Sequence, residues 1–278
     1  MNLIEELQSR GHLLKPEGSG NYRVVGHGGL IVKDNAWYSH SQGIGGNATT
    51  LLEKIGIAYN NPNHLDPSNF SISKSEPKSS LDGELYPLSA RSKWYLLRRH
   101  IHEDLIDELN ERGTLREDRK GYICFVGYNG KNNVKCVSCR SIESHLNVQK
   151  YERAGSCKHY SFSIPSDKSS DVVILCEGPI DALSIACLEE IKHHRGYFET
   201  TKIATCGAPS SHIARRVQRL QPKTIILAFD NDVAGDRMAE AVEYLLKYYN
   251  FEILRAKPGK GKDPNEWLED HVKKLLMK

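Results

Sequence analysis

The chain has 278 residues, of which 38 are Lys or Arg and 35 are Asp or Glu, so its formal net charge is +3. This length allows one large or two modest domains, and a charge so near zero gives no general attraction to nucleic acid, so any basic surface must be local. No apolar run approaches the roughly 20 residues that cross a bilayer. The first residues lack the basic and apolar blocks of a signal peptide, so we expect a cytoplasmic protein without membrane contact.

Residues 1–57 are predicted to form a small α+β unit. Hydrophobic spacing and the flanking turn residues favour a helix, a hairpin and a second short helix, in that order. The ranges expected for them are 3–7, 22–32 and 48–55. Residues 58–88 are rich in Asn, Pro and Ser and are predicted to be a linker.

Residues 89–168 are predicted to form an α+β subdomain. Apolar residues keep helical spacing up to Gly113, which fits either one helix or two short helices broken near His102. A turn at Asn129-Gly130 then separates two strand-like segments, a pattern typical of a hairpin. Residues 160–164 are expected to form a further strand.

Residues 169–278 alternate strand and helix strictly. Strands are expected at 172–176, 202–206, 224–229 and 251–256, and helices at 180–192, 211–220, 234–248 and 264–276. Four successive βα units predict an α/β domain with a four-stranded parallel sheet covered by helices on both faces.

The seven cysteines are odd in number and irregular in spacing, which indicates reduced thiols. Only Cys136 and Cys139 have metal-ligand spacing, with Cys124 and Cys157 as candidates to complete a site. A structural zinc site normally needs four soft ligands. The alternative is a strand that carries two thiols, and we expect no zinc.

Three acidic residues follow two of the predicted parallel strands: Glu177 after the first, and Asp230 and Asp232 after the third. Ligands collect beyond the carboxyl ends of strands in such sheets, and alternate residues of an extended segment point to the same side. Hard oxygen ligands suit Mg²⁺ or Mn²⁺. The alternative is that Glu177 and Asp232 are only N-caps of the helices that follow.

The segment Glu177-Gly178-Pro179-Ile180-Asp181-Ala182-Leu183-Ser184 resembles the first signature of Toprim domains, the metal-dependent catalytic domain of bacterial primases, type IA and type II topoisomerases and certain nucleases. Asp230-Asn231-Asp232, followed by Ala234-Gly235, resembles the second signature. The resemblance implies that Asp230 and Asp232 hold Mg²⁺ and that Glu177 is a metal ligand or a general acid/base.

The same resemblance makes two more acidic residues candidates for the metal site. Asp181 matches a further acidic position of the first signature and would support the ligands, or it is a helix acid favoured by the macrodipole. The segment 262–266 resembles the acidic element that closes the sheet in primase-type Toprim domains, so Asp263 is a candidate ligand for an additional metal. Its alternative role is the N-cap of a helix with Pro at the first position.

Four cations are candidates for phosphate or nucleic-acid contacts. Lys260 and Lys262 lie in a basic loop beside the acidic residues. This loop either binds phosphates or is an ordinary solvated turn. Arg140 and Lys158 lie in the middle unit and could steady phosphate charge next to a metal site. Their alternative is a surface or hairpin cation.

The upstream units also resemble known families. Residues 37–48 resemble the zinc-binding amino-terminal domain of bacterial primases, but residues 1–57 contain no Cys, so the zinc ligands are missing. The middle unit resembles an uncharacterised domain that precedes Toprim in proteins of plasmids and integrative elements.

Together these resemblances imply a primase-like protein of a mobile element that makes RNA primers from NTPs on single-stranded DNA. No Walker sequence is present, so a helicase would be a separate partner. A Toprim nuclease with the same carboxylates is the first alternative, and a non-catalytic module that binds nucleic acid or protein is the second. A topoisomerase is disfavoured because this length cannot hold the strand-passage architecture.

Overall fold

The computed structural model describes residues 3–9, 11–18, 20–25, 29–39, 44–47, 51, 81–143, 148–168, 171–194, 196–208, 210–258 and 261–277. Contacts divide the chain into two compact units, Met1–Ser75 and Glu76–Lys278. Within the described residues, no helix has the length and apolar character needed to span a membrane.

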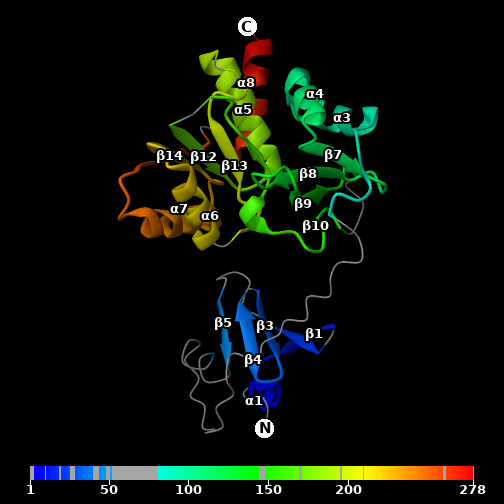
Figure 1. Cartoon of the computed structure of the whole chain (residues 1–278), viewed down its shortest axis with the longest axis vertical. Helices are drawn as coiled ribbons and strands as arrows, with labels where there is room; N and C mark the ends of the chain where they lie inside the picture. The colour runs from blue at the N-terminus through cyan, green and yellow to red at the C-terminus, as the bar shows by residue number, and fades with distance from the viewer. Residues whose placement is uncertain are drawn as a thin grey trace. The chain divides into compact units, whose positions relative to one another are not determined.

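The first unit is a five-stranded antiparallel sheet with strands in chain order, and helix α1 contacts it at β3 (Figure 1). The elements are α1 (Leu3–Ser9), β1 (Leu14–Gly18), β2 (Asn21–Val24), β3 (Leu30–Lys33), β4 (Ala36–Ser39) and β5 (Ile44–Asn47). The predicted hairpin is confirmed by the pairing of Tyr22 with Val32. Most of the helix expected at 48–55, and residues 58–80 of the expected linker, lie outside the described residues.

Two glycines of the segment 37–48, Gly45 and Gly46, lie in a strand. Both lie inside β5, where Gly45 is opposite Tyr38. A Cβ at Gly45 would stand 2.7 Å from the carbonyl oxygen of Trp37. Glycine is therefore required there for close packing of the strands rather than for a turn.

The second unit begins with an antiparallel sheet in the order β10-β9-β8-β7-β6. Its elements are β6 (Leu85–Tyr86), α3 (Ala90–Leu97), α4 (Glu103–Glu111), β7 (Leu115–Asp118), β8 (Ile123–Tyr128), β9 (Val134–Arg140) and β10 (Lys150–Glu152). Of the two helical alternatives, the pair of short helices is confirmed, since His102 is the N-cap of α4. The predicted hairpin is also confirmed as β8 and β9, whereas β6, β7 and β10 have no counterpart in the sequence-based prediction.

The second sheet of this unit has the order β11-β13-β12-β14-β15. Its strands are β11 (Ser163–Ile164), β12 (Val172–Cys176), β13 (Thr201–Ala204), β14 (Thr224–Ala228) and β15 (Glu252–Arg255), and its helices are α5 (Pro179–His193), α6 (Ser210–Leu220), α7 (Val233–Leu246) and α8 (Pro264–Leu276). The four predicted parallel strands are confirmed. β11 adds a fifth strand that runs antiparallel to β13, and it comes from residues assigned by sequence to the preceding subdomain.

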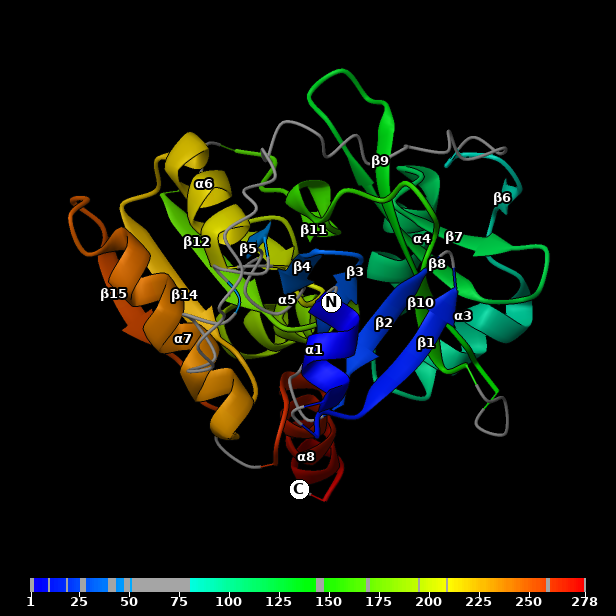
Figure 2. The same cartoon turned by 90° about the horizontal axis from the view of Figure 1, so that it is seen from below.

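Helices cover both faces of the parallel sheet (Figure 2). Val173 and Leu175 of β12 pack in a cluster with residues of α6 and α7, whereas Ile174 and Cys176 pack in a cluster with residues of α5 and α8. This alternation follows from the two-residue period of a strand, and it explains why β12 has an unbroken apolar sequence.

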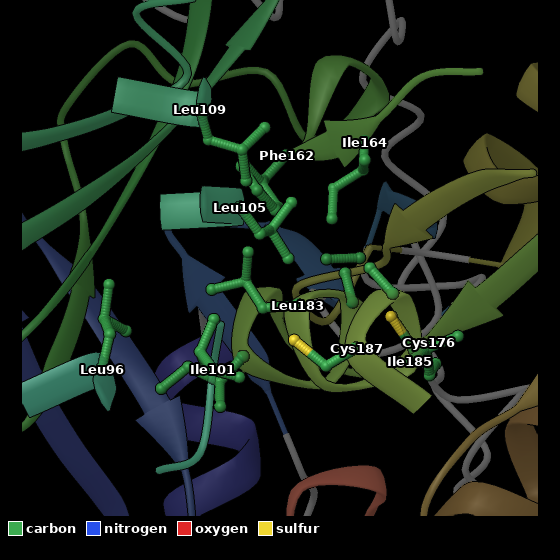
Figure 3. Packing of buried hydrophobic residues seen from close by; sticks show 14 of the residues in the cluster. Leu96, Ile101, Leu105, Leu109, Phe162, Ile164, Cys176, Leu183, Ile185 and Cys187 are labelled. Carbon is green, nitrogen blue, oxygen red and sulfur yellow. The ribbon is translucent and has the colours of Figure 1, made fainter. Parts of the chain in front are cut away.

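One hydrophobic core joins the two sheets of the second unit. Figure 3 shows Leu105 and Leu109 of α4 in the same cluster as Leu183 of α5. Polar contacts extend the junction, because the buried amide of Asn265 donates to the Arg99 carbonyl at 2.9 Å and accepts from the Arg99 guanidinium at 2.9 Å. The parallel sheet is thus anchored to the antiparallel one.

Candidate metal centre

Asp230 is the buried acid at the carboxyl end of β14, with 8% of its surface exposed. Its backbone carbonyl accepts from the Arg255 guanidinium at 2.9 Å. Gly235 packs against the same carbonyl so closely that a Cβ would stand 2.1 Å from the oxygen. Because nothing larger fits between them, the start of α7 is pressed against the chain at Asp230.

Asp232 and Asp263 each begin a helix. The Asp232 carboxylate accepts from the Gly235 N–H at 2.9 Å as the N-cap of α7, and the Asp263 carboxylate accepts from the Glu266 N–H at 2.8 Å as the N-cap of α8. The capping roles given as alternatives for these two residues are therefore real. They do not exclude a metal, since each cap uses one carboxylate oxygen and leaves the other available.

Lys262 lies between the two acids of the Asp-x-Asp segment. Its ammonium is 3.0 Å from Asp232 Oδ2 and 3.6 Å from Asp230 Oδ2. The two carboxylates thus face one positive group together. This agrees with the expectation that alternate residues of the segment point the same way.

Glu177 lies at the neighbouring strand end, directly after β12. Its backbone carbonyl accepts from the Cys206 N–H at 2.9 Å, which links the loop after β12 to the loop after β13. The residue is exposed. Its side chain is therefore unconstrained by packing, unlike that of Asp230.

Asp181 lies in the first turn of α5, and its Oδ2 accepts from the Gly178 N–H at 2.7 Å. Burial raises the pKa of Asp181 to about 7, against the lowering effect of that hydrogen bond, and the charges of Asp263 and Asp230 raise it further. Asp181 therefore stands in the same electrostatic environment as the strand-end acids.

The pKa values of Asp230 and Asp232 move in opposite directions. Burial raises the pKa of Asp230 to about 6, and the negative charges of Glu177 and Asp263 add to the rise. The hydrogen bond from the Gly235 N–H, followed by that from Lys262, lowers the pKa of Asp232. Of these two carboxyl groups, Asp230 is therefore the one whose charged form is disfavoured in the folded chain.

Whether a divalent cation fits this site depends on the carboxylate oxygens of Glu177, Asp230 and Asp232. Among the described residues, one set of three or more His, Cys, Asp or Glu side chains has ligand atoms that all lie within 4.8 Å of one another, and that set lies elsewhere in the fold. Glu177, Asp230 and Asp232 therefore do not form so tight a cluster. Asp230 and Asp232 already face one ammonium, and the donors are all hard oxygens. Carboxylate oxygens are the donor type that Mg²⁺ and Mn²⁺ prefer, so the chemistry of the pair fits such an ion.

The predicted phosphate contacts separate into different groups. Lys262 joins the acids directly, whereas Lys158 donates to the Cys206 carbonyl at 2.8 Å, in the loop that also contacts Glu177. Arg140 donates to the Tyr95 hydroxyl at 3.0 Å, and no contact links it to the acids among the described residues. Lys260 lies outside the described residues.

Arg255 is a structural determinant of the centre and is not among the candidate residues named from the sequence. Its guanidinium donates to four backbone carbonyls, those of Leu227, Phe229, Asp230 and Ala256. It also pairs with Asp236 at 3.2 Å. An Arg at the end of the edge strand β15, four residues before a glycine, is the sequence signal, but its target cannot be read without the fold.

Comparison with known proteins relates part of this chain to a family. Residues 174–268 match the family model described as Toprim-like. This segment is a Toprim-like domain. The resemblance drawn from the two acidic signatures is thereby confirmed, and the match spans the parallel sheet from β12 to α8.

Several solved primases are similar to this chain. The zinc-binding and RNA polymerase domains of Aquifex aeolicus primase share 17% identity, with 100% of this chain and 82% of that chain covered and a TM-score of 0.48. The primase fragment of the bacteriophage T7 primase-helicase shares 15%, covering 96% and 97%, with a TM-score of 0.46. The E. coli primase catalytic core shares 14%, covering 67% and 71%, with a TM-score of 0.47. A search of curated proteins gave no match.

Proposed function

We propose that this protein is a primase-like, Mg²⁺-dependent nucleotidyltransferase that synthesises RNA primers on single-stranded DNA. The observation that carries the proposal is the pairing of the buried Asp230 and the capping Asp232 around the single ammonium of Lys262 at the strand ends of a Toprim-like domain. Sites that bind Mg²⁺ for phosphoryl transfer commonly hold the ion by one or two carboxylates together with the substrate phosphates.

Asp230 and Asp232 would hold the metal, and a bound Mg²⁺ would neutralise developing phosphate charge and favour ionisation of the attacking hydroxyl. Lys262 is 57% exposed and sits at the end of a long side chain, so it can leave the carboxylates and pair with a nucleotide phosphate. Glu177 would accept a proton or add a ligand oxygen.

The substrates we propose are NTPs as monomers and single-stranded DNA as template. Lys158 supports this proposal, because its ammonium donates to the loop that contacts Glu177 and carries a charge suited to phosphate. A separate helicase as partner, and a role in a mobile element, remain predictions from the sequence.

The test is incubation of the full chain with labelled single-stranded DNA, NTPs and Mg²⁺ or Mn²⁺. Extended products support the proposal, and their loss in Asp230→Asn with retention in Glu240→Gln assigns them to this centre. Glu240 is an exposed acid on α7 and serves as the matched control.

Shortened DNA in the same assay, lost in Asp230→Asn, would replace the proposal with the nuclease, which uses the same carboxylates. Absence of both products together with absence of Mg²⁺ or Mn²⁺ binding by calorimetry would favour the non-catalytic binding module.

A further inference from the structure

A second cluster of ligand-type side chains lies in the antiparallel sheet of the second unit. Tyr151 of β10 is directly opposite Cys139 of β9, which is directly opposite Cys124 of β8. Asp118, the last residue of β7, completes the group from the next strand. Four neighbouring strands thus contribute one residue each (Figure 1).

The ligand atoms of this cluster are close together. One carboxylate oxygen of Asp118 and the sulfurs of Cys124 and Cys139 all lie within 4.8 Å of one another, and the two sulfurs are 3.3 Å apart. Both cysteines and Asp118 are buried. A disulfide would require roughly 2.05 Å between the sulfurs, so these are two separate thiols in contact.

The arrangement differs from the one that the sequence suggested. Cys136 and Cys139 have metal-ligand spacing, but three residues along a strand place them on opposite faces. Cys139 packs with Val137 and Tyr122 in the cluster on one face, whereas Cys136 is absent from that cluster and is affected electrostatically by Cys206. The partner of Cys139 is therefore Cys124, on the neighbouring strand.

We propose that Asp118, Cys124 and Cys139 bind a thiophilic divalent cation of the Zn²⁺ class. Two thiolates and one carboxylate are a donor set that favours Zn²⁺ over Mg²⁺ or Ca²⁺. The three anions and the ion together carry one negative charge. Arg153 lies near both thiols and binds only the carbonyls of Leu81, Gly83 and Glu84 among the described residues, so its positive charge balances that excess.

The geometry requires only a small adjustment. Two Zn–S bonds of about 2.3 Å at a tetrahedral angle place the sulfurs roughly 3.8 Å apart, so the thiols need to separate by about half an ångström. Asp118 is already oriented, since its Oδ1 accepts from the N–H groups of Lys120 and Tyr122 at 2.8 and 3.0 Å.

Tyr151 supports the carboxylate. Its hydroxyl donates to Asp118 Oδ2 at 2.6 Å. Hydrogen bonds to a ligating carboxylate fix its direction toward the metal. The ion would join β7, β8, β9 and β10, and this role is independent of the strand-end carboxylates.

The first experiment needs no variant. The full chain, purified under reducing conditions and freed of any metal-binding tag, is analysed for metal by mass spectrometry, and about one zinc per chain is expected. Replacement by Co²⁺ should give the near-ultraviolet charge-transfer absorption of thiolate-bound cobalt. Less than a tenth of a zinc per chain, before and after incubation with Zn²⁺, overturns the proposal. A Cys124–Cys139 disulfide in that preparation overturns it too.

Variants then assign the ligands. Cys139→Ser should lose the zinc and the cobalt absorption, whereas Cys136→Ser, the same change in a buried thiol on the same strand, should keep both. Equal loss in the two variants contradicts the proposed ligand set. If Cys139→Ser does not fold, Tyr151→Phe decides: we expect roughly 10- to 100-fold weaker metal binding, and unchanged affinity overturns the role of the cluster.

Discussion

The parallel and antiparallel sheets of the second unit gather polar groups in different ways. In the parallel sheet, Glu177, Asp230 and Asp232 come from the loops at the strand ends, where each follows an apolar run. In the antiparallel sheet, Asp118, Cys124, Cys139 and Tyr151 project from the strands themselves. Strand ends collect groups that can reach solvent and substrate, whereas a strand face collects groups that become buried.

The donors differ accordingly. The strand ends present hard oxygens around an exposed ammonium, which suits an ion that exchanges and takes part in turnover. The strand face presents two sulfurs and an oxygen in a buried cluster, which suits an ion that stays and stabilises. The strand ends and the strand face should therefore respond differently to substitution, metal removal and pH.

The largest effect is expected from Asp230→Asn. Loss of a direct ligand should lower the rate of primer synthesis by more than the roughly 10- to 100-fold that removal of a supporting residue costs, while the zinc content stays unchanged. The measurement is product formation per chain, with metal analysis of the same sample. Wild-type turnover by this variant would remove the metal mechanism from the strand ends.

Gly235→Ala should damage the strand ends through packing alone. The added Cβ would stand 2.1 Å from the Asp230 carbonyl oxygen, and overpacking of this kind costs about 1–3 kcal/mol. Urea unfolding measures the loss. Gly130→Ala is the control, because a Cβ there has no neighbour within 4 Å. Equal stability of the two variants would show that the close approach is unimportant.

The pH dependence of stability should reveal the buried acid. The pKa of Asp230 is about 6 in the folded chain and 3.8 when unperturbed, so the folded state binds this proton more tightly. The resulting stabilisation is complete below pH 3.8 and is lost as the pH rises through about 6.

In metal-free buffer, this loss should lower the free energy of unfolding by about 2 kcal/mol between pH 4 and 7 relative to Asp230→Asn. Denaturant titrations of both proteins across that range measure it. Asp232→Asn should show the opposite trend, because the pKa of Asp232 is lowered. Parallel pH profiles for wild type and Asp230→Asn would mean that burial does not perturb this carboxyl.

The smallest effect is expected at Asp263, where capping and charge can be separated. Asp263→Ala should cost about 1 kcal/mol of stability by removing the N-cap of α8. Asp263→Asn keeps a capping oxygen and should cost only a few tenths. If primer synthesis falls equally in both variants, the charge matters to the centre; if only the Ala variant loses activity, Asp263 acts through the helix alone.

The alternation of strands and helices after residue 169 was readable from the sequence because buried parallel strands are short, apolar and bounded by turns. α8 was predicted with its observed bounds, Pro264–Leu276, since an N-cap Asp and a following Pro mark its start. β11 could not be predicted as part of that sheet. It has two residues, and its pairing with β13 joins Ser163 to Ile203, which is 40 positions away, as the difference of these numbers gives.

The sequence by itself determined the α/β class, the acidic signatures and their order, because local periodicity and short motifs carry that information. Only the tertiary structure decided that Lys262 bridges Asp230 and Asp232, that Arg255 binds the carbonyls around them, and that Cys139 meets Cys124 rather than Cys136. Those contacts join residues that lie far apart in the chain, and strand register and loop closure set them rather than spacing along the sequence.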